Sequence, residues 1–231
     1  MLHYVTLTID GAEVRAPEGT SVLEAALAYG VCIPHLCHVQ GLTPLGACRL
    51  CIVELIENGR SKVTASCTLD VREGMIIRSN SEKIRMLRRN IAELLVAEAP
   101  NSRAIQDIAV RCGVTKVRYP FRHKDCVLCG RCVRVCAEMW QANAIGFVGR
   151  GKDRRVDYPF GARPDSCKQG NGCVDICPMT ITPCGGPMKP GEEHLCGQCE
   201  SQLSMERDMP GTCVLCELGK GFHCLRQSPW H

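Results

Sequence analysis

The stretch CHVQGLTPLGACRLC, residues 37–51, places three cysteines close together, and a fourth, Cys67, follows in TASC. Together Cys37, Cys48, Cys51 and Cys67 have the spacing C-x10-C-x2-C-x15-C. Plant-type [2Fe–2S] sites use C-x4-C-x2-C…C, so the C-x2-C core and the distant fourth ligand are kept while the loop is longer. The spacing therefore predicts a [2Fe–2S] cluster on these four thiolates. The alternative is a zinc site on the same cysteines, although structural zinc usually takes two C-x2-C pairs.

The whole chain has 231 residues, of which 19 are cysteines. Its N-terminus, MLHYVTLTID, has neither the basic nor the apolar segment of a signal peptide. No stretch is apolar for long enough to span a membrane. We therefore expect a cytoplasmic protein whose thiols stay reduced and act as metal ligands rather than disulfides. The net charge of +4 is mild and lacks interleaved aromatics, which argues against nucleic-acid binding.

The first 80 residues carry the signals of a small α+β domain. Apolar residues alternate over 4–9, and Asp10-Gly11 predicts a tight hairpin turn into a second strand. Ser21 and Glu24 are placed as a capping box for a helix that ends near Gly30. A second hairpin is predicted around Asn58-Gly59. This pattern predicts a small mixed sheet packed on one helix.

The middle of the chain has helical periodicity. Residues 82–98 carry apolar side chains at helical spacing, namely Ile84, Leu87, Ile91, Leu94 and Leu95. A shorter helix is predicted over about 102–112, and together the two helices form a connector. The basic run RMLRRN within the first helix is interpreted as a solvated face. Farther along, residues 147–165 read as a hairpin or an exposed loop.

Two further cysteine groups follow, CVLCGRCVRVCAE at 126–138 and CKQGNGCVDICP at 167–178. The first has the C-x2-C-x2-C-x3-C spacing of bacterial [4Fe–4S] ferredoxins, in which the fourth cysteine of each run binds the other cluster. One cluster is therefore assigned to Cys126, Cys129, Cys132 and Cys177. The second is assigned to Cys136, Cys167 and Cys173.

Gly170 stands where this second cluster should find its fourth thiolate. Cys184 could replace it, which is the interpretation we favour. The iron could instead take an outside ligand, or be lost to leave a three-iron cluster.

The C-terminal segment contains two C-x2-C pairs, Cys196 with Cys199 and Cys213 with Cys216. This arrangement approximates a zinc ribbon and favours a structural zinc ion. A third [4Fe–4S] cluster, using Cys224 or Cys184, is the alternative.

The remaining cysteines and histidines are given structural interpretations. Cys32 and Cys112 are expected to be buried small side chains. His123 is expected at the surface. His35 and His38 flank Cys37 and are expected to shield or tune the cluster rather than bind it.

The string GVCIPHLCHVQGLTPLGACRLCIVEL, residues 30–55, resembles the N-terminal domain of the large iron–sulfur subunit of respiratory complex I. It also resembles the matching domain of [FeFe] hydrogenases, NAD-linked formate dehydrogenases and the diaphorase part of NAD-reducing hydrogenases. The resemblance implies a β-grasp ferredoxin fold for this domain. Family members often carry a cluster ligated by one histidine and three cysteines after the LL of the connector helix. Here LLVAEAPNSRAIQDIAVRCGV lacks that motif, so we expect this cluster to be missing.

These interpretations divide the chain into four parts: 1–80, a [2Fe–2S] ferredoxin-like domain; 81–118, a helical connector; 119–184, a [4Fe–4S] ferredoxin-like domain; and 185–231, a cysteine-rich metal-binding tail. The resemblance implies an electron-transfer subunit in a hetero-oligomer. It would relay single electrons between a flavoprotein that oxidises NADH or reduces NAD and a hydrogenase, formate dehydrogenase or other reductase. No motif for a substrate, flavin or NAD site is recognised, so whether the chain is itself an enzyme stays open. Two alternatives remain: a catalytic subunit with an open cluster iron near Gly170, or a structural metal-bound adaptor.

Overall fold

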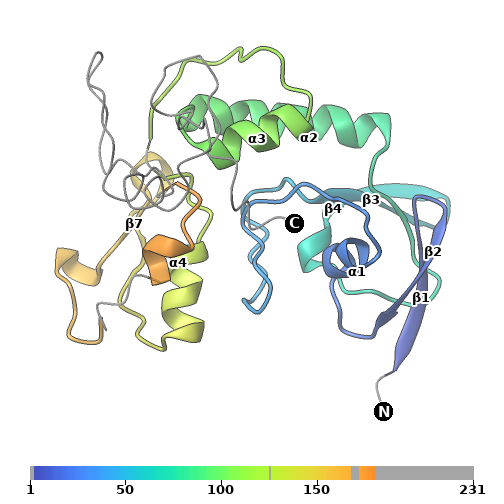
Figure 1. Cartoon of the computed structure of the whole chain (residues 1–231), viewed down its shortest axis with the longest axis horizontal. Coiled ribbons are helices and arrows are strands. Elements are labelled where there is room, and N and C mark those ends of the chain that lie inside the picture. The colour runs from blue at the N-terminus through green and yellow to red at the C-terminus, as the bar shows by residue number, and fades with distance from the viewer. Residues whose placement is uncertain (1–2, 125, 168–171, 180–231) are drawn as a thin grey trace, which may run out of the picture.

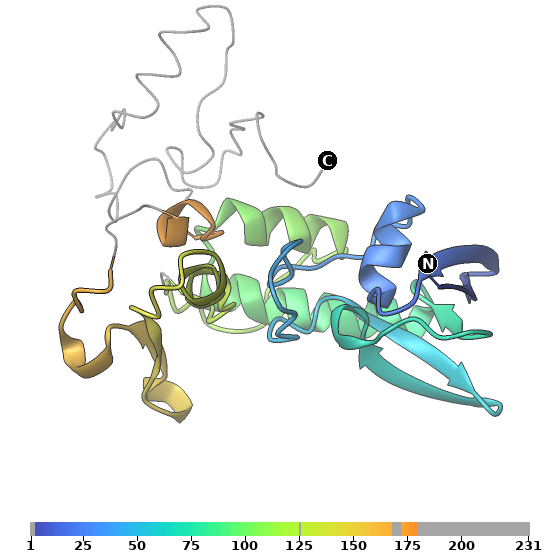
Figure 2. The same cartoon turned by 90° about the horizontal axis from the view of Figure 1, so that it is seen from below.

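The computed structural model describes residues 3–124, 126–167 and 172–179. A sheet domain lies at one end of the long axis (Figure 1). The second cysteine-rich region, residues 126–167 and 172–179, lies at the other end. Two helices, α2 (Glu82–Glu98) and α3 (Arg103–Arg111), run between these ends, as the turned view also shows (Figure 2). Within the described ranges, no helix has the length and apolar character needed to cross a membrane.

Both predicted hairpins of the sheet domain are confirmed. Strands β1 (Tyr4–Ile9) and β2 (Ala12–Pro17) pair antiparallel, as do β3 (Ile52–Glu57) and β4 (Arg60–Ala65). Each turn has two consecutive residues with positive φ, as a type I′ turn requires: 49° and 87° at Asp10-Gly11, and 49° and 72° at Asn58-Gly59.

A fifth strand, β5 (Ile76–Arg78), joins the two hairpins and was not predicted from the sequence. It pairs parallel to β1 and antiparallel to β3, which gives the strand order β2-β1-β5-β3-β4. Three residues are too few to show alternation, and their partners are distant in the sequence. The result is the mixed sheet that the sequence predicts, with its centre supplied by the shortest strand.

Helix α1 (Val22–Ala28) packs on this sheet. The predicted capping box is present: the Glu24 N–H donates to Ser21 Oγ at 3.2 Å, while the Glu24 carboxylate reaches back to the Ser21 N–H. Gly30 has φ +77° immediately after the helix, as expected of a C-terminal cap. The buried core between helix and sheet includes Leu7, Ile9, Val14, Leu23 and Ile77.

The connector helices form a second core. Ala92, Ile105 and Ile108, from α2 and α3, pack with Leu36 and Leu50 of the N-terminal domain. Cysteines from both cysteine-rich regions are part of the same core, namely Cys37, Cys48 and Cys129. Leu94, expected on the apolar face, is instead half exposed. The two helices therefore hold the N-terminal loop and the second region in one packed unit.

The second region has little regular structure. Its elements are α4 (Arg131–Arg134), the π-helical turn η2 (Val135–Met139), strands β6 (Gly146–Val148) and β7 (Arg155–Asp157), the 3₁₀ turns η3 (Gly151–Asp153) and η4 (Pro159–Gly161), and α5 (Gly172–Asp175). Strands β6 and β7 pair antiparallel, which confirms the hairpin interpretation of this segment.

Candidate metal centres

The four cysteines of the N-terminal pattern come together beside the sheet. Cys37 and Cys48 lie in the long loop between α1 and β3, and Cys51 directly precedes β3. Cys67 lies in a single 3₁₀ turn, η1 (Ser66–Thr68), after β4. Three of these thiols are buried and Cys48 is partly buried. The β3–β4 hairpin thus brings Cys67 back to the loop, because its two ends meet.

These four thiols are arranged as two pairs. The Cys37 N–H donates to Cys48 Sγ at 3.4 Å, and the Cys48 N–H donates to Cys37 Sγ at 3.5 Å. Cys51 and Cys67 are joined by a hydrogen bond between their side chains. Among the described residues, no group of three or more Cys, His, Asp or Glu side chains closes around one metal ion.

Within each pair the hydrogen bond moves the two thiol pKa values in opposite directions. The hydrogen bond from Cys48 lowers the pKa of Cys37 to about 5, while the pKa of Cys48 is raised. In the same way the pKa of Cys51 falls to about 6 through its bond with Cys67, whose own pKa is raised. One sulfur of each pair is therefore ready to act as a thiolate, the form that binds iron.

The loop that carries these thiols has a tightly folded backbone. Gly46 has φ +67°, and a Cβ there would lie 3.3 Å from Thr68 Cγ2. Arg49, between Cys48 and Leu50, also has a positive φ of 56°. A non-glycine residue in this conformation costs free energy and is frequent at binding sites.

Arg88 of α2 is an exception to the interpretation of the basic run as a solvated face, although Arg85 and Arg89 of that run are exposed. The Arg88 side chain is buried, and it donates to Leu50 O at 2.9 Å, Ile52 O at 2.8 Å and Ser79 O at 3.2 Å. Leu50 ends the loop, Ile52 begins β3 and Ser79 follows β5, so one buried side chain joins the loop to the sheet and gives its guanidinium backbone partners. The sequence did contain a signal, since Arg88 lies four residues from both Ile84 and Ala92 on the buried face.

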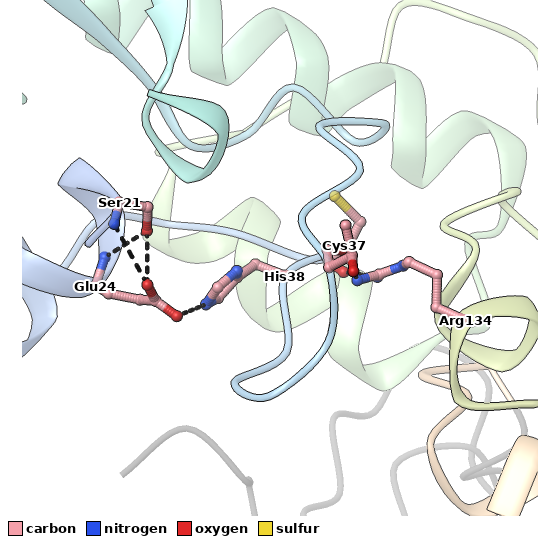
Figure 3. A network of polar contacts seen from close by, with 6 residues as sticks. Ser21, Glu24, Cys37, His38 and Arg134 are labelled. Carbon is pink, nitrogen blue, oxygen red and sulfur yellow. Dashed lines mark hydrogen bonds and ion pairs between the residues drawn. The ribbon is translucent and has the colours of Figure 1, made fainter. Parts of the chain in front are cut away.

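A buried histidine, His38, follows Cys37 in the loop and faces Glu24 of α1 (Figure 3). His38 Nε2 is 3.7 Å from Glu24 Oε1, and burial lowers the pKa of His38, with the Glu24 charge opposing this. His35 Nδ1 lies 2.8 Å from Ile33 O, and burial lowers its pKa as well. Both imidazoles are thus favoured as neutral groups, and their shielding role stays a prediction.

In the second region, Cys126, Cys129, Cys132 and Cys177 act on one another electrostatically. Burial, with the charges of the other three thiols, raises the pKa of Cys132 to about 12. The Leu128 N–H donates to Cys126 Sγ at 3.3 Å from a backbone with φ 55°. The chain thus brings Cys177, which is distant in sequence, to the first cysteine run.

A separate group contains Cys136, Cys167 and Cys173. Cys167 packs against the small core that includes Cys136, and the Ala144 N–H donates to Cys136 Sγ at 3.2 Å. Burial raises the pKa of Cys173, and the charges of Cys136 and Cys167 raise it further. Gly170 and Cys184 lie outside the described residues, as do the cysteines of the tail, namely Cys196, Cys199, Cys213, Cys216 and Cys224.

The other cysteines and histidines divide between confirmed and wrong predictions. Cys32 is exposed, so the expectation that it is buried was wrong. Cys112 is half buried and packs in the connector core. His123 is exposed, as predicted. Helices α2 and α3 are joined by residues 99–102 alone, where the sequence lacks the histidine and cysteines of the additional cluster motif.

Two family models match the chain. A 2Fe-2S iron–sulfur cluster binding domain matches residues 3–82. The ferredoxin-like domain of NADH-quinone oxidoreductase subunit 3 matches residues 121–181. The predicted [2Fe–2S] domain and [4Fe–4S] ferredoxin-like domain are both confirmed by these matches.

The chain is also similar to large subunits of known oxidoreductases. It is 32% identical over 199 residues to NADPH-Fe(3+) oxidoreductase subunit alpha of Geobacter sulfurreducens, with 75% of this chain and 23% of that protein covered. It is 27% identical over 205 residues to the mitochondrial NADH-ubiquinone oxidoreductase 78 kDa subunit of Candida albicans, with 77% and 28% covered. The chain thus spans about a quarter of the length of these curated relatives.

A solved structure is similar over most of both chains. The crystal structure of an NAD+-reducing [NiFe]-hydrogenase in the H2-reduced state contains a chain with 30% identity and a TM-score of 0.66. The match covers 76% of this chain and 85% of that one. With the thiol groups and both domain matches, this shows that the chain belongs to the family of iron–sulfur subunits that includes the 78 kDa subunit of NADH-ubiquinone oxidoreductase and the NAD+-reducing [NiFe]-hydrogenase chain.

Proposed function

We propose that this chain is the electron-transfer subunit of a multi-subunit oxidoreductase. It would pass single electrons between a flavoprotein that reacts with NAD(H) and a second redox subunit, such as a hydrogenase, formate dehydrogenase or other reductase. The observation that carries this proposal is that one apolar core, built on α2 and α3, contains thiols of both cysteine-rich regions. Such a core holds redox centres at fixed separation, as an electron relay needs.

For the N-terminal site we propose a [2Fe–2S] cluster. Cys37 and Cys48 would bind one iron, and Cys51 and Cys67 the other. The support is the division of the four thiols into two hydrogen-bonded pairs, because a binuclear cluster takes two thiolates on each iron. A single zinc ion would need all four around one point.

For the second region we propose two [4Fe–4S] clusters with crossed ligands. Cys177 would join the first run, and Cys136 would join Cys167 and Cys173. The electrostatic coupling of Cys132 to Cys177, and of Cys173 to Cys136, supports this division. Cys184 remains the proposed fourth ligand of the second cluster, and a structural zinc ion remains the proposal for the tail.

Bound clusters would supply one-electron chemistry, and the chain's own residues set the conditions for it. Burial of Cys37, Cys51 and Cys67 excludes water from the N-terminal site. Backbone N–H groups aimed at Cys126 Sγ and Cys136 Sγ stabilise negative charge on the sulfurs. Both effects tune reduction potential. Reduced thiols of this kind are suited to the cytoplasm, which is the location we propose.

The test is to replace Cys48 by serine and reconstitute the full chain, without oxygen, with an NADH-oxidising flavoprotein. Electron flow to a downstream acceptor should fall at least about tenfold, since the N-terminal site loses one of four thiolates. Cys32→Ser is the matched control, because Cys32 is exposed and belongs to neither thiol group. Turnover of Cys48→Ser equal to that of the control would contradict the relay function of this site.

A further inference from the structure

The two cysteine-rich regions meet where the loop between α1 and β3 contacts α4. This helix lies within the first [4Fe–4S] cysteine group, residues 126–138. The Thr43 N–H donates to Glu138 Oε2 at 2.7 Å. Leu45 lies directly over Gly130, where a Cβ would be only 2.6 Å from Leu45 Cδ2. Gly130 also has φ +71°, so this position needs glycine for both conformation and contact.

Arg134 of α4 crosses this junction. Its side chain is 7% exposed and contacts three backbone carbonyls. Nε donates to Gly130 O at 3.3 Å on its own helix, and Nη1 donates to Thr43 O at 2.7 Å in the opposite loop. Nη2 donates to the carbonyl of Cys37, itself a proposed ligand (Figure 3). One guanidinium therefore fastens the N-terminal loop to the ferredoxin run at two points.

A second buried guanidinium lies close by. Arg131 is 5% exposed, and its charge interacts with thiols of both regions: Cys129 on one side, Cys37 and Cys48 on the other. Burial lowers the pKa of Arg131, and these thiols oppose that effect. An arginine nevertheless stays charged in proteins. The carboxylate of Glu138, which accepts from the Thr43 N–H at this junction, is exposed and screened by water.

Positive charge held in a buried site lowers the energy of any group that gains an electron beside it. At an effective dielectric constant of about 20, a unit charge about 12 Å away changes a one-electron equilibrium by roughly tenfold. A planar guanidinium also binds two carbonyls with fixed geometry, which a lysine cannot reproduce. Charge and position are thus separable contributions of the same side chain.

We propose that Arg134 is the positioning residue for direct electron exchange between the N-terminal site and the first four-iron site, and that its charge raises the reduction potential of the N-terminal site. This inference rests on the proposed function. In the exchange, one site gives up one electron and the other gains it, and no bond or proton moves. Arg134 lies on the helix of the first four-iron run and donates to the carbonyls of Thr43 and Cys37, so it joins the two segments that carry these sites.

The experiment uses the full, anaerobically loaded chain with Arg134→Gln, Arg134→Lys and the control Arg155→Gln. Arg155 lies in the same region, but its side chain is 64% exposed and pairs with Asp157 on the surface. Three quantities are measured: the midpoint potential of the binuclear EPR signal, the magnetic interaction between reduced clusters, and hydrogen exchange of residues 41–45.

Arg134→Gln should shift the reduction equilibrium about tenfold toward the oxidised form, which is about 59 mV for one electron. It should also speed exchange of residues 41–45 and weaken the magnetic interaction. Arg134→Lys should keep the wild-type potential while exchange still rises, because the charge remains and the paired contacts do not. Arg155→Gln should change none of these.

Wild-type potential and wild-type exchange in Arg134→Gln would overturn the inference while leaving the proposed function intact. If that variant does not retain iron, Arg134→Lys decides: faster exchange supports the positioning role, and unchanged exchange contradicts it. Failure of the proposed function is seen separately, as a wild-type chain that binds no iron or accepts no electrons.

Discussion

The two ends of this molecule contain cysteines in comparable numbers but are stabilised differently. The N-terminal domain buries a continuous apolar core between five strands and α1, including Leu7, Ile9 and Leu23. Among its described residues, the second region has a small core of its own, Cys136, Ala142 and Ala144 with Ile145 and Cys167 packed against it, while Val127, Cys129 and Met179 pack into the connector core. Apolar burial provides most of the folding free energy of a domain. The first region can therefore fold around its site, whereas the second needs metal to hold it together.

Metal removal tests this contrast with the largest expected effect. In a chain stripped of iron by a chelator, residues 126–167 and 172–179 should lose hydrogen-exchange protection almost completely. Residues in β1, β3 and α1 should keep most of theirs, because their core contains few metal ligands. Hydrogen exchange read by mass spectrometry gives both results in one sample. Equal loss of protection at both ends would contradict the difference between the two regions.

Leu7→Ala examines the apolar core of the first region. Leu7 is 1% exposed in the centre of that core, so its truncation should lower the free energy of unfolding by about 2–5 kcal/mol. Leu27→Ala is the matched control, since Leu27 on α1 is 38% exposed and should cost much less. Denaturant unfolding of the metal-free chain, followed by circular dichroism, measures both. Similar costs for the two variants would mean that this core does not stabilise the domain.

Gly130→Ala examines the junction between the regions and has a smaller expected effect. An alanine there meets Leu45 Cδ2 at 2.6 Å and Phe147 Cζ at 3.0 Å, in addition to its unfavourable φ. Gly113→Ala is the matched control. Gly113 also has a φ of +71°, but a Cβ there would come no closer than 3.7 Å to its nearest neighbour, the side chain of Arg89. The difference between the two variants in the loaded chain should be about 1–3 kcal/mol, the cost of overpacking. Equal thermal stability would show that the junction tolerates displacement.

The sequence predicted best where local chemistry decides the structure. The turns at Asp10-Gly11 and Asn58-Gly59 require residues that accept positive φ, and both hairpins form where these pairs stand. Ser21 and Glu24 likewise begin α1 as expected. Cysteine spacing predicts that Cys177 joins the first run, because ligand spacing is set by the geometry of a cluster, and the electrostatic interaction of Cys132 with Cys177 is consistent with it.

Features that depend on tertiary contacts could not be predicted in this way. Strand β5 has three residues, and its partners in β1 and β3 lie far away in sequence. Arg88 and Arg134 are charged and were expected at the surface or left unassigned, yet both are buried on backbone carbonyls. A charged side chain is buried only where such partners exist, and the sequence does not display those partners. Cys32, expected to be buried, is exposed for the same reason: no local pattern specifies its neighbours.

The decisive measurement for electron transfer by this chain is to purify it whole without oxygen, count iron and zinc, and reduce it stepwise under EPR. We expect about ten iron atoms per chain, with one binuclear signal and four-iron signals that appear as electrons are added. About fourteen irons without zinc would place a further cluster in the tail. A chain with stoichiometric zinc, few irons and no reducible signal would contradict the electron-transfer role, because its cysteines would then hold structure and not electrons.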